Sequence, residues 1–485
     1  MEKHVIIEQT HIEVYPYQLG DEPSLEKMLS KKVYYNNRYY TYVPFTFHIE
    51  DDVLYLPRGI SPGMVAKRFN TQPTNGWGSD PYMKIPQYEV TAPPKNDIQE
   101  EAIRFLLCEG EFSNNQNFTQ FSLNLDQGDG KTYSCVNALL QYSIKAIIIT
   151  HQEKIKEQWY NTFHTMTDVP DDAICNIAGT EVLHSIMDMK ESPKYHFYLV
   201  NHQTLAGYGR RYGWNKVREF FQKIKVGIKV IDEAHLFFEN TLMIDYFSNT
   251  YKTFYLTATF NRSDHQEVYQ FKRAFQSVVR FGEETFNYEE KRKQVVFVVV
   301  FFQSIPLLGT PPKVRTAHGF SSYKYIDYEL SDESGRVLDQ VVKKIITQSE
   351  RLEGKRLILS PKTDSAEHFK RLIADNFDYS VGTIHSKNDP SVNQETMQKD
   401  FVSSTSKSFG TGADLKGLRI LINTEPIGGS LLADQVRGRL REYSKDKDTF
   451  LFYPVDTIFQ DTSRMLKQIL PVMKKKCKEI IMMHM

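Results

Sequence analysis

Two short motifs constrain this chain more than any other feature of its sequence. The motif DEAH at residues 232–235 directly follows residues 226–231, a mostly apolar run that is typical of a buried strand. The motif GDGKT at residues 128–132 lies about 100 residues upstream and offers the glycines, cation and hydroxyl that a phosphate-binding turn before a helix needs. Together the two motifs indicate a site for a nucleoside triphosphate and its metal ion.

The composition is that of an ordinary soluble globular protein. The 485 residues suffice for about three domains of roughly 150 residues each. Lys+Arg and Asp+Glu both number 60, so a nucleic-acid partner would have to bind local basic patches rather than a polycation. The 28 Tyr and 31 Phe residues fit strand cores or, alternatively, platforms for base stacking.

Several features predict a cytoplasmic protein without a membrane segment. The four cysteines are widely separated and form no CxxC pair, which argues against a zinc site or a disulfide framework and favours a reducing compartment. The longest apolar run, residues 295–302, is far shorter than the ~20 residues that span a bilayer. No secretory leader pattern opens the chain. We therefore expect a cytoplasmic location, which for a viral chain would be the host cytoplasm.

Residues 1–92 differ from the rest of the chain and predict a small α+β accessory domain. Short runs of strand-like composition alternate with turn signals such as Pro-Arg-Gly at residues 57–59. These runs are residues 4–7, 12–17, 32–42 and 53–56. Residues 70–86 are rich in Asn, Gly and Pro and predict a loop or linker. We expect this domain to grip nucleic acid.

From residue 93 onward, predicted strands and helices alternate, which is typical of crossover units and a parallel sheet. The alternation pauses between about residues 283 and 322 and then resumes. The pattern predicts an α/β fold with two parallel-sheet lobes, residues 93–285 and residues 286–485. Functional residues should then lie at the carboxyl ends of the strands.

The GDGKT turn predicts specific phosphate contacts. Gly128 and Gly130 would let the backbone approach the phosphates, Lys131 would reach the β and γ phosphates, and Thr132 would hold Mg²⁺ through its hydroxyl. The strict pattern for such a loop has glycine where this chain has Leu125. The alternative is a glycine-rich loop in which Lys-Thr occurs by chance.

The two acids of the DEAH motif would divide the remaining chemistry. Asp232 would hold Mg²⁺ in the outer shell of the ion, and Glu233 would orient and deprotonate the attacking water. Phosphoryl transfer depends mainly on positioning and charge neutralisation, so these few groups suffice. The alternative is a strand end that carries two solvated acids.

The combination of motifs resembles superfamily 2 helicases and translocases. GDGKT resembles motif I, DEAH with its His235 resembles motif II, and residues 257–259 resemble motif III, which couples the ATP site to nucleic acid in that family. Residues 148–150 and 157–159 resemble motif Ia and the helix after it. The resemblance further implies two RecA-like lobes, ATP and Mg²⁺ as cofactors, an adenine contact for Gln99, and nucleic-acid or coupling roles for His235, Gly179, Thr180, Thr257, Thr259 and Thr405.

The second lobe carries the later motifs of the same family. Thr405 with Gly412 and Asp414 resembles motif V, and residues 435–441 resemble motif VI. The resemblance assigns catalytic roles to Gln435, Arg439 and Arg441, with the arginines acting on the γ-phosphate. Many members carry an arginine seven residues after the glutamine, where this chain has Glu442, so the role of Arg441 rests on a variant of the motif.

The resemblance covers about residues 95–455 and is nearest to UvsW-type, XPB-like and RecG-like duplex translocases. It implies an ATP-dependent DNA helicase or translocase that unwinds or remodels duplex or branched DNA, with replication or recombination proteins as partners. Two alternatives stay open: an ATPase switch gated by duplex RNA or DNA, and a motor subunit of a restriction or defence complex.

Candidate nucleic-acid contacts are small polar or basic residues at predicted strand ends, suited to phosphates rather than to base edges. They are residues 151–152, 179–180, 201–203, 360–363, 385–387 and 405–407. Residues 208–212 place two arginines between tyrosines and predict a solvated loop or, alternatively, a stacking contact. Residues 474–476 predict the polar face of a last helix.

Overall fold

The computed structural model divides the chain into two compact units, Met1–Asn287 and Tyr288–Met485. The residues described are 2–35, 38–42, 46–76, 80–125, 128–257, 270–271, 273–281, 293–306, 309–317, 319–409, 415–440, 443 and 447–485. Unit 1 contains an N-terminal region (residues 2–76) and a large parallel sheet with its helices, here called lobe 1. Unit 2 contains a second large parallel sheet, here called lobe 2. The predicted domain boundaries at residues 92 and 285 stay predictions.

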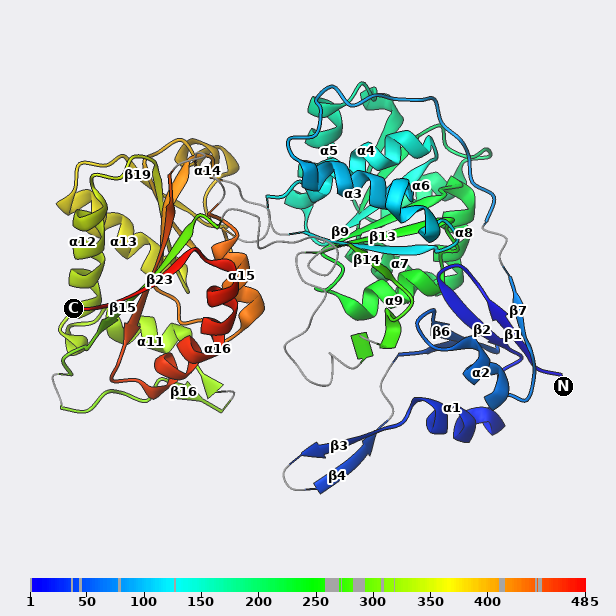
Figure 1. Ribbon diagram of the computed structural model, residues 1–485, viewed down its shortest axis with the longest axis horizontal. Coiled ribbons are helices and arrows are strands. Elements are labelled where there is room, and N and C mark those ends of the chain that lie inside the picture. Colours follow the sequence, from blue (N-terminus) through cyan, green and yellow to red (C-terminus); the bar gives the residue numbers. More distant parts are fainter. Residues whose placement is uncertain are drawn as a thin grey trace. The chain divides into compact units, whose positions relative to one another are not determined.

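The N-terminal region is a mixed sheet that packs two helices on one face (Figure 1). The sheet order is β5-β6-β2-β1-β7, and β3 and β4 form a separate antiparallel hairpin. The strands are β1 (His4–Ile7), β2 (His11–Tyr15), β3 (Lys31–Tyr35), β4 (Arg38–Tyr42), β5 (His48–Glu50), β6 (Val53–Pro57) and β7 (Pro73–Asn75), and the helices are α1 (Glu22–Leu29) and α2 (Pro62–Arg68).

Two expectations for this region were wrong. Residues 70–86 are not all loop, because β7 lies within them and pairs in parallel with β1. Its pairing partner lies about 70 residues away, so no local pattern could indicate the strand. Residues 32–42 are not one strand but the hairpin β3–β4, whose turn lies outside the described residues.

Both faces of the N-terminal sheet are covered, and the alternation along each strand explains how. Ile12 and Val14 of β2 face a core that they share with α1 and α2. The intervening His11 and Glu13 face lobe 1, as does Tyr55 of β6, which belongs to the core of lobe 1. The sheet is therefore held between its own helices and lobe 1.

Lobe 1 is built on a parallel sheet with the order β10-β11-β9-β12-β13-β8-β14 among the described residues. Its strands are β8 (Gln120–Asn124), β9 (Ala146–Thr150), β10 (Ile174–Ile177), β11 (Phe197–Asn201), β12 (Ile228–Asp232), β13 (Lys252–Thr257) and β14 (Val279–Phe281). Its helices are α3 (Asp97–Leu107), α4 (Lys131–Tyr142), α5 (Glu153–Met166), α6 (Thr180–Asp188), α7 (His202–Tyr212), α8 (Trp214–Ile224) and α9 (Phe238–Tyr246). Figure 1 shows α3, α4 and α5 on one side of the sheet and α7 and α9 on the other.

The alternation of strands and helices in lobe 1 agrees with the sequence prediction, with one exception. Residues 208–212, expected as a solvated loop, form the end of α7, and Tyr208 is buried. Leu205, Ala206 and Tyr208 pack into the core of the lobe, so tertiary burial overrides the two glycines of α7, Gly207 and Gly209.

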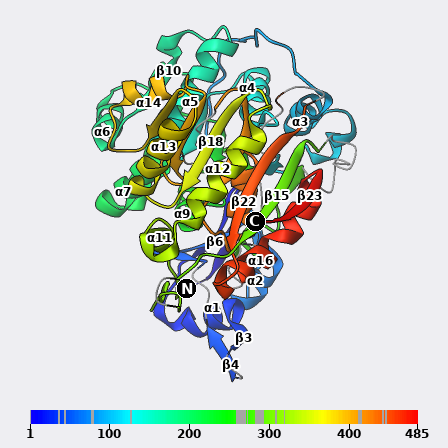
Figure 2. The same ribbon diagram turned by 90° about the vertical axis from the view of Figure 1, so that its left-hand side faces the viewer.

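Lobe 2 is a second parallel sheet with the order β19-β20-β18-β21-β22-β15-β23 among the described residues. The strands are β15 (Val295–Phe302), β18 (Lys355–Ser360), β19 (Val381–Ile384), β20 (Phe401–Thr405), β21 (Leu418–Asn423), β22 (Thr449–Asp456) and β23 (Glu479–His484). The short β16 (Arg315–Thr316) and β17 (Gly319–Phe320) form a hairpin, and the helices are α11 (Ser322–Glu329), α12 (Val337–Ser349), α13 (Thr363–Asn376), α14 (Pro390–Thr396), α15 (Ser430–Arg437) and α16 (Gln460–Lys476). Figure 2 shows the lobe from the side that carries α12 and α13.

The expected pause in the alternation between residues 283 and 322 was wrong. Val295–Phe302 is β15, an interior strand between β22 and β23. Phe297 and Val299 pack toward α15 and α16, whereas Val296 and Val298 pack toward α12 and α13. A parallel strand buried on both faces has no polar alternation, so its continuous apolar run gives no period-2 signal. Within the described residues, no helix has the length and apolar character to cross a membrane.

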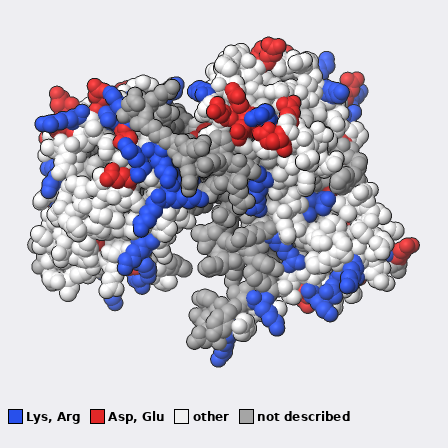
Figure 3. Space-filling model, viewed as in Figure 1, with Lys and Arg blue, Asp and Glu red and all other residues white. Residues whose placement is uncertain are grey.

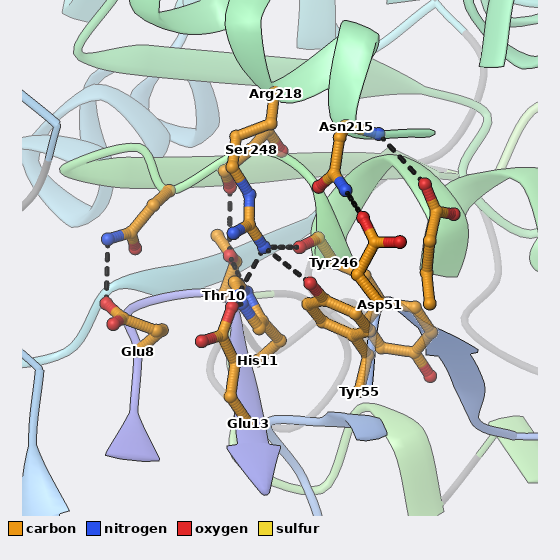
Figure 4. Close-up of polar contacts among 12 residues, drawn as sticks. Glu8, Thr10, His11, Glu13, Asp51, Tyr55, Asn215, Arg218, Tyr246 and Ser248 are labelled. Carbon is orange, nitrogen blue, oxygen red and sulfur yellow. Dashed lines mark hydrogen bonds and ion pairs between the residues drawn. The ribbon is translucent and has the colours of Figure 1, made fainter. Parts of the chain in front are cut away.

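A polar network joins the N-terminal region to lobe 1 (Figure 4). Arg218 of α8 donates from Nη2 to Glu13 Oε1 at 2.8 Å and to the hydroxyl of Tyr55 at 3.2 Å. Glu50 Oε1 accepts from the backbone N–H groups of Trp214 and Asn215 at the first turn of α8, at 3.1 and 3.2 Å. A carboxylate at a helix N-terminus is favourable, so Glu50 both caps and orients α8.

Arg218→Met should loosen this interface, because Glu13 would keep its half-buried place without its cation. We expect a loss of about 1–3 kcal/mol in the free energy of unfolding of unit 1, measured by urea denaturation, and faster proteolysis of the N-terminal region. Lys216→Met is the matched control, since this exposed cation on the same helix should contribute less than about 0.5 kcal/mol. Unchanged stability of the Arg218 variant would contradict the assigned role of the network.

The pH dependence of this interface should depend on Glu8. Burial and the neighbouring Glu13 raise the pKa of Glu8 from 4.5 to about 7, although Asn249 Nδ2 donates to its carboxylate at 2.7 Å. The folded state therefore holds the proton of Glu8 more tightly than the unfolded state does. The stability that this proton adds to the folded state is fully present below pH 4.5 and is lost as the pH rises through 7.

Glu8→Gln removes the charge and keeps an acceptor for Asn249. We expect this variant to match the wild type near pH 4.5 and to be more stable at about pH 8, by about 1 kcal/mol after allowing for solvent screening of a half-buried group. Urea midpoints at the two pH values measure the effect. Equal midpoints for both proteins at pH 8 would contradict it, and exposed Glu22→Gln serves as the control.

Candidate nucleotide and nucleic-acid site

The GDGKT turn connects the carboxyl end of β8 to the first residue of α4, as the sequence predicts. Gly128 and Gly130 have φ values of 92° and 89°, in the left-handed region that favours glycine. A Cβ at Gly130 would lie 2.1 Å from Nε2 of Gln99, so a larger residue would have to displace the Gln99 side chain. The backbone conformation therefore favours glycine at residue 130, and the close approach of Gln99 adds to that preference.

Gln99 braces this turn from α3. Its side chain is buried, its Oε1 accepts from the backbone N–H of Lys95 at 2.9 Å, and its Nε2 donates to the carbonyl of Asp129 at 3.3 Å. The Asn96 side chain caps the helix by accepting from the backbone N–H of Gln99 at 3.0 Å. The predicted contact of Gln99 with adenine stays a prediction.

Lys131 and Thr132 are the first two residues of α4, at the positive end of the helix dipole. The first turn of α4 carries no acidic residue, so its N–H groups and its lysine together form an electropositive end. Lys131 Nζ donates to the carbonyl of Leu125 at 2.7 Å, which holds the ammonium against the start of the turn. Such an arrangement suits a phosphate group.

Asp232 ends β12 at the same edge of the sheet. The indole N–H of Trp159, a fully buried residue of α5, donates to Asp232 Oδ2 at 2.8 Å. Burial and Glu233 raise the pKa of Asp232, and the Trp159 hydrogen bond and Lys131 oppose that shift. The sequence analysis did not place Trp159 in the site, because the contact joins residues 73 positions apart.

The DEAH motif contacts the end of the neighbouring strand. Glu233 adopts a left-handed conformation with φ 49°, and its Oε2 lies 3.3 Å from Nδ1 of the buried His235. The same His235 nitrogen lies 2.8 Å from Thr257 Oγ1 at the end of β13. The structure therefore brings together residues that the sequence assigned to motifs II and III, while Thr259 lies outside the described residues.

Other predicted contacts lie at the ends of β9, β10 and β11, on the same sheet edge. Thr150 Oγ1 donates to Asn201 Oδ1 at 2.8 Å, so Asn201 helps to hold the strand ends together. The ring of His202 lies 4.1 Å from that of Phe237, and burial together with His151 lowers the pKa of His202 to about 4. Gly179, with φ 98°, precedes α6, and Thr180 is the first residue of that helix.

In unit 2, Thr405 ends β20 and is buried, and its Oγ1 accepts from the backbone N–H of Ser408 at 2.9 Å. Gln435 lies in α15, whose Arg437 is fixed by an ion pair with Asp434 at 2.8 Å. The guanidinium of Arg439 lies 5.3 Å from the ring centre of Phe409. The predicted site residues Gly412, Asp414 and Arg441 lie outside the described residues.

Comparisons with known proteins give one family match and a set of similar solved structures. Residues 94–262 match the family model described as Type III restriction enzyme, res subunit. The solved structure of S. cerevisiae Dbp5 bound to RNA and ADP BeF3 is 13% identical, with 80% of this chain and 89% of that chain covered and a TM-score of 0.51. A search of curated proteins found no match.

Two further solved structures have TM-scores below 0.5, which carry no argument. A point variant of S. cerevisiae Dbp5, bound to a point variant of Gle1 and to IP6, is 12% identical, with 80% of this chain and 88% of that chain covered and a TM-score of 0.49. T4 UvsW is 13% identical over 100% of both chains with a TM-score of 0.34.

The family match covers both the GDGKT turn and the DEAH motif, and the similarity to Dbp5 concerns the fold. The prediction of two RecA-like lobes with a mixed N-terminal sheet is confirmed. Residues 94–262 therefore resemble the res subunit of Type III restriction enzymes, and the two lobes have the fold seen in Dbp5.

Proposed function

We propose that this ATPase unwinds or remodels duplex or branched DNA and binds Mg²⁺-ATP at the carboxyl edge of the lobe 1 sheet. The observation that carries the proposal is the meeting of the GDGKT turn, Asp232 and the His235–Thr257 contact at one edge. The strand order β12-β13-β8 explains this meeting. Thr257 ends β13, which lies between β12 with Asp232 and β8 with the GDGKT turn.

Each group at this edge has a role that suits its chemistry. The N–H groups of the turn and the ammonium of Lys131 bind phosphate oxygens, which bear the developing charge during phosphoryl transfer. Glu233 orients the attacking water and accepts its proton. The contact of His235 with Thr257 links these groups to the segment that follows β13.

Mg²⁺ fits the oxygen donors at this site. A hydroxyl from Thr132 and a carboxylate from Asp232 are the hard ligands that this ion prefers, with water and phosphate oxygens completing its shell. Bound there, Mg²⁺ would neutralise charge on the phosphates. Trp159 holds the Asp232 carboxylate in one orientation.

In lobe 2, we assign the arginine-finger role to Arg439 and Arg441, with Gln435 beside the nucleotide. Arg437 is excluded from this role because Asp434 holds its guanidinium within the lobe. Gly412 and Asp414 would complete the nucleotide contacts of motif V. Gly179, Thr180, Thr259 and Thr405 would contact or couple to the nucleic acid.

The match to the res subunit family supports a second candidate, a motor subunit of a restriction complex. One experiment separates the candidates: the ATPase rate without nucleic acid and with single-stranded, duplex, forked and four-way DNA and duplex RNA, at two salt concentrations. Strongest stimulation by forked or four-way DNA supports remodelling of branched DNA. Stimulation by duplex RNA alone contradicts the DNA assignment, and activity that requires a partner protein favours the motor subunit.

Lys131→Ala should leave the fold intact and lower the ATP turnover rate at least about a hundredfold, because a positioned charge on the phosphates is lost. A steady-state ATPase assay and a thermal unfolding curve measure the two effects. Lys190→Ala, an exposed lysine of the same lobe, is the matched control and should hydrolyse ATP normally. Normal turnover by the Lys131 variant would remove the phosphate-binding role from this turn.

Trp159→Phe should lower turnover by about tenfold or more, because the hydrogen bond that orients Asp232 is lost while the ring still fills the core. Single-turnover hydrolysis and the Mg²⁺ concentration for half-maximal rate measure this effect. Tyr160→Phe, at the next position of the same helix and away from Asp232, should leave both unchanged. A Trp159 variant with the wild-type rate and wild-type Mg²⁺ dependence would show that Asp232 needs no such support.

A further inference from the structure

The hairpin β3–β4 forms a sheet of its own, separate from the five-stranded N-terminal sheet. Figures 1 and 2 both show it beyond α1, extending away from the rest of unit 1. Tyr39 and Tyr40 of β4 are 75% and 50% exposed. Exposed aromatic rings on a small hairpin offer flat faces on which a ligand can stack.

The sequence of the hairpin is basic although the whole chain is neutral. Residues 30–47 contain Lys31, Lys32 and Arg38 and no Asp or Glu, and Lys27 lies in the last turn of the preceding α1. Lys32 and Arg38 are exposed. Figure 3 shows Lys and Arg side chains gathered on this end of unit 1.

Four acidic residues of the N-terminal region, Glu8, Glu13, Glu50 and Asp51, accept hydrogen bonds from lobe 1 residues. The preceding α1 carries Glu22 and Glu26 as well as Lys27, so the net positive charge is that of the hairpin segment itself, residues 30–47. Such a local positive charge suits a polyanion as the ligand of the hairpin.

We propose that the β3–β4 hairpin binds a single strand of nucleic acid, with bases stacked on Tyr39 and Tyr40 and phosphates held by Lys32 and Arg38. Stacking on a side chain requires a base whose face is open, which a single strand offers and an intact duplex does not. The proposal rests on the nucleic-acid-dependent function and gives the strand a second contact, outside the sheet edge that carries the nucleotide motifs. Stacking is tolerant of sequence, so this contact reads no base identity.

The helix before the hairpin and the loop after β6 are both held against lobe 1. Arg273 Nη2 donates to the carbonyl of Met28, three residues before β3, at 2.8 Å. The backbone N–H of Gly59 donates to the carbonyl of Ala274 at 3.1 Å. A Cβ at Gly59 would lie 2.3 Å from the carbonyl oxygen of Arg273, so this approach requires glycine. A strand held by the hairpin therefore follows lobe 1.

The test compares binding of single strands and duplexes by the full chain. Tyr39→Ala/Tyr40→Ala should weaken binding of a fluorescent oligo-dT of about 20 nucleotides at least about tenfold, because each stacked base contributes substantially. Binding of a blunt duplex of the same length should change less than about threefold. Tyr39→Phe/Tyr40→Phe should bind the single strand like the wild type, since phenyl rings stack without the hydroxyl. Fluorescence anisotropy at two salt concentrations measures all of these.

Phe118→Ala is the matched control, because Phe118 is an exposed aromatic of unit 1 just before β8, at the opposite edge from the nucleotide motifs. It should bind both ligands like the wild type. Single-strand binding of the alanine variant of the hairpin within about threefold of wild type would overturn the proposal. An equal loss for single strand and duplex would also overturn it, by making the hairpin a duplex contact.

The two proposals can fail separately. If the wild-type chain bound neither ligand and nucleic acid did not stimulate its ATPase, the proposed function would fail, and the hairpin assignment with it. If the wild type bound single strands and was stimulated by nucleic acid while the alanine variant bound equally well, only the hairpin assignment would fail.

Discussion

The parallel pairing of the lobe 1 strands is the constraint on which the rest of the site depends. Parallel strands place all their carboxyl ends at one edge, and the helices that follow begin at that edge with their positive ends. β12 delivers Asp232, β13 delivers Thr257, and β8 leads into the GDGKT turn. The GDGKT turn and Asp232, about 100 residues apart in the sequence, are thus brought to the same edge of the sheet.

The residues of the GDGKT and DEAH motifs could be predicted from sequence, because each motif is a short run whose glycines, lysine and acids follow a predicted strand directly. Gly130 shows this best, since its left-handed backbone conformation favours glycine over any other residue. Trp159 could not be predicted in the same way. A tryptophan among apolar residues of a helix looks like any core residue, and only the fold brings its N–H to Asp232.

The fold predictions failed where burial removes the usual signal. β15 is buried on both faces, so its sequence has no alternation of polar and apolar residues. From the sequence, the apolar run was recognised only as too short to span a membrane. α7 contains two glycines, yet its apolar residues pack into the core of lobe 1. β7 depends on a partner at the start of the chain. In each case a contact distant in sequence decides the local structure.

The interface between the N-terminal region and lobe 1 adds a mechanical consequence. Ion pairs in a half-buried interface contribute little net stability, because desolvation offsets attraction, but they tolerate only a narrow range of orientations. Arg218 meets Glu13 while Arg273 meets the end of α1, so two separate contacts fix the region. Residues 273–274 lead directly into β14, which pairs with β8, the strand before the GDGKT turn. The contacts that hold the N-terminal region and the GDGKT turn are thereby joined through one pair of neighbouring strands, β14 and β8.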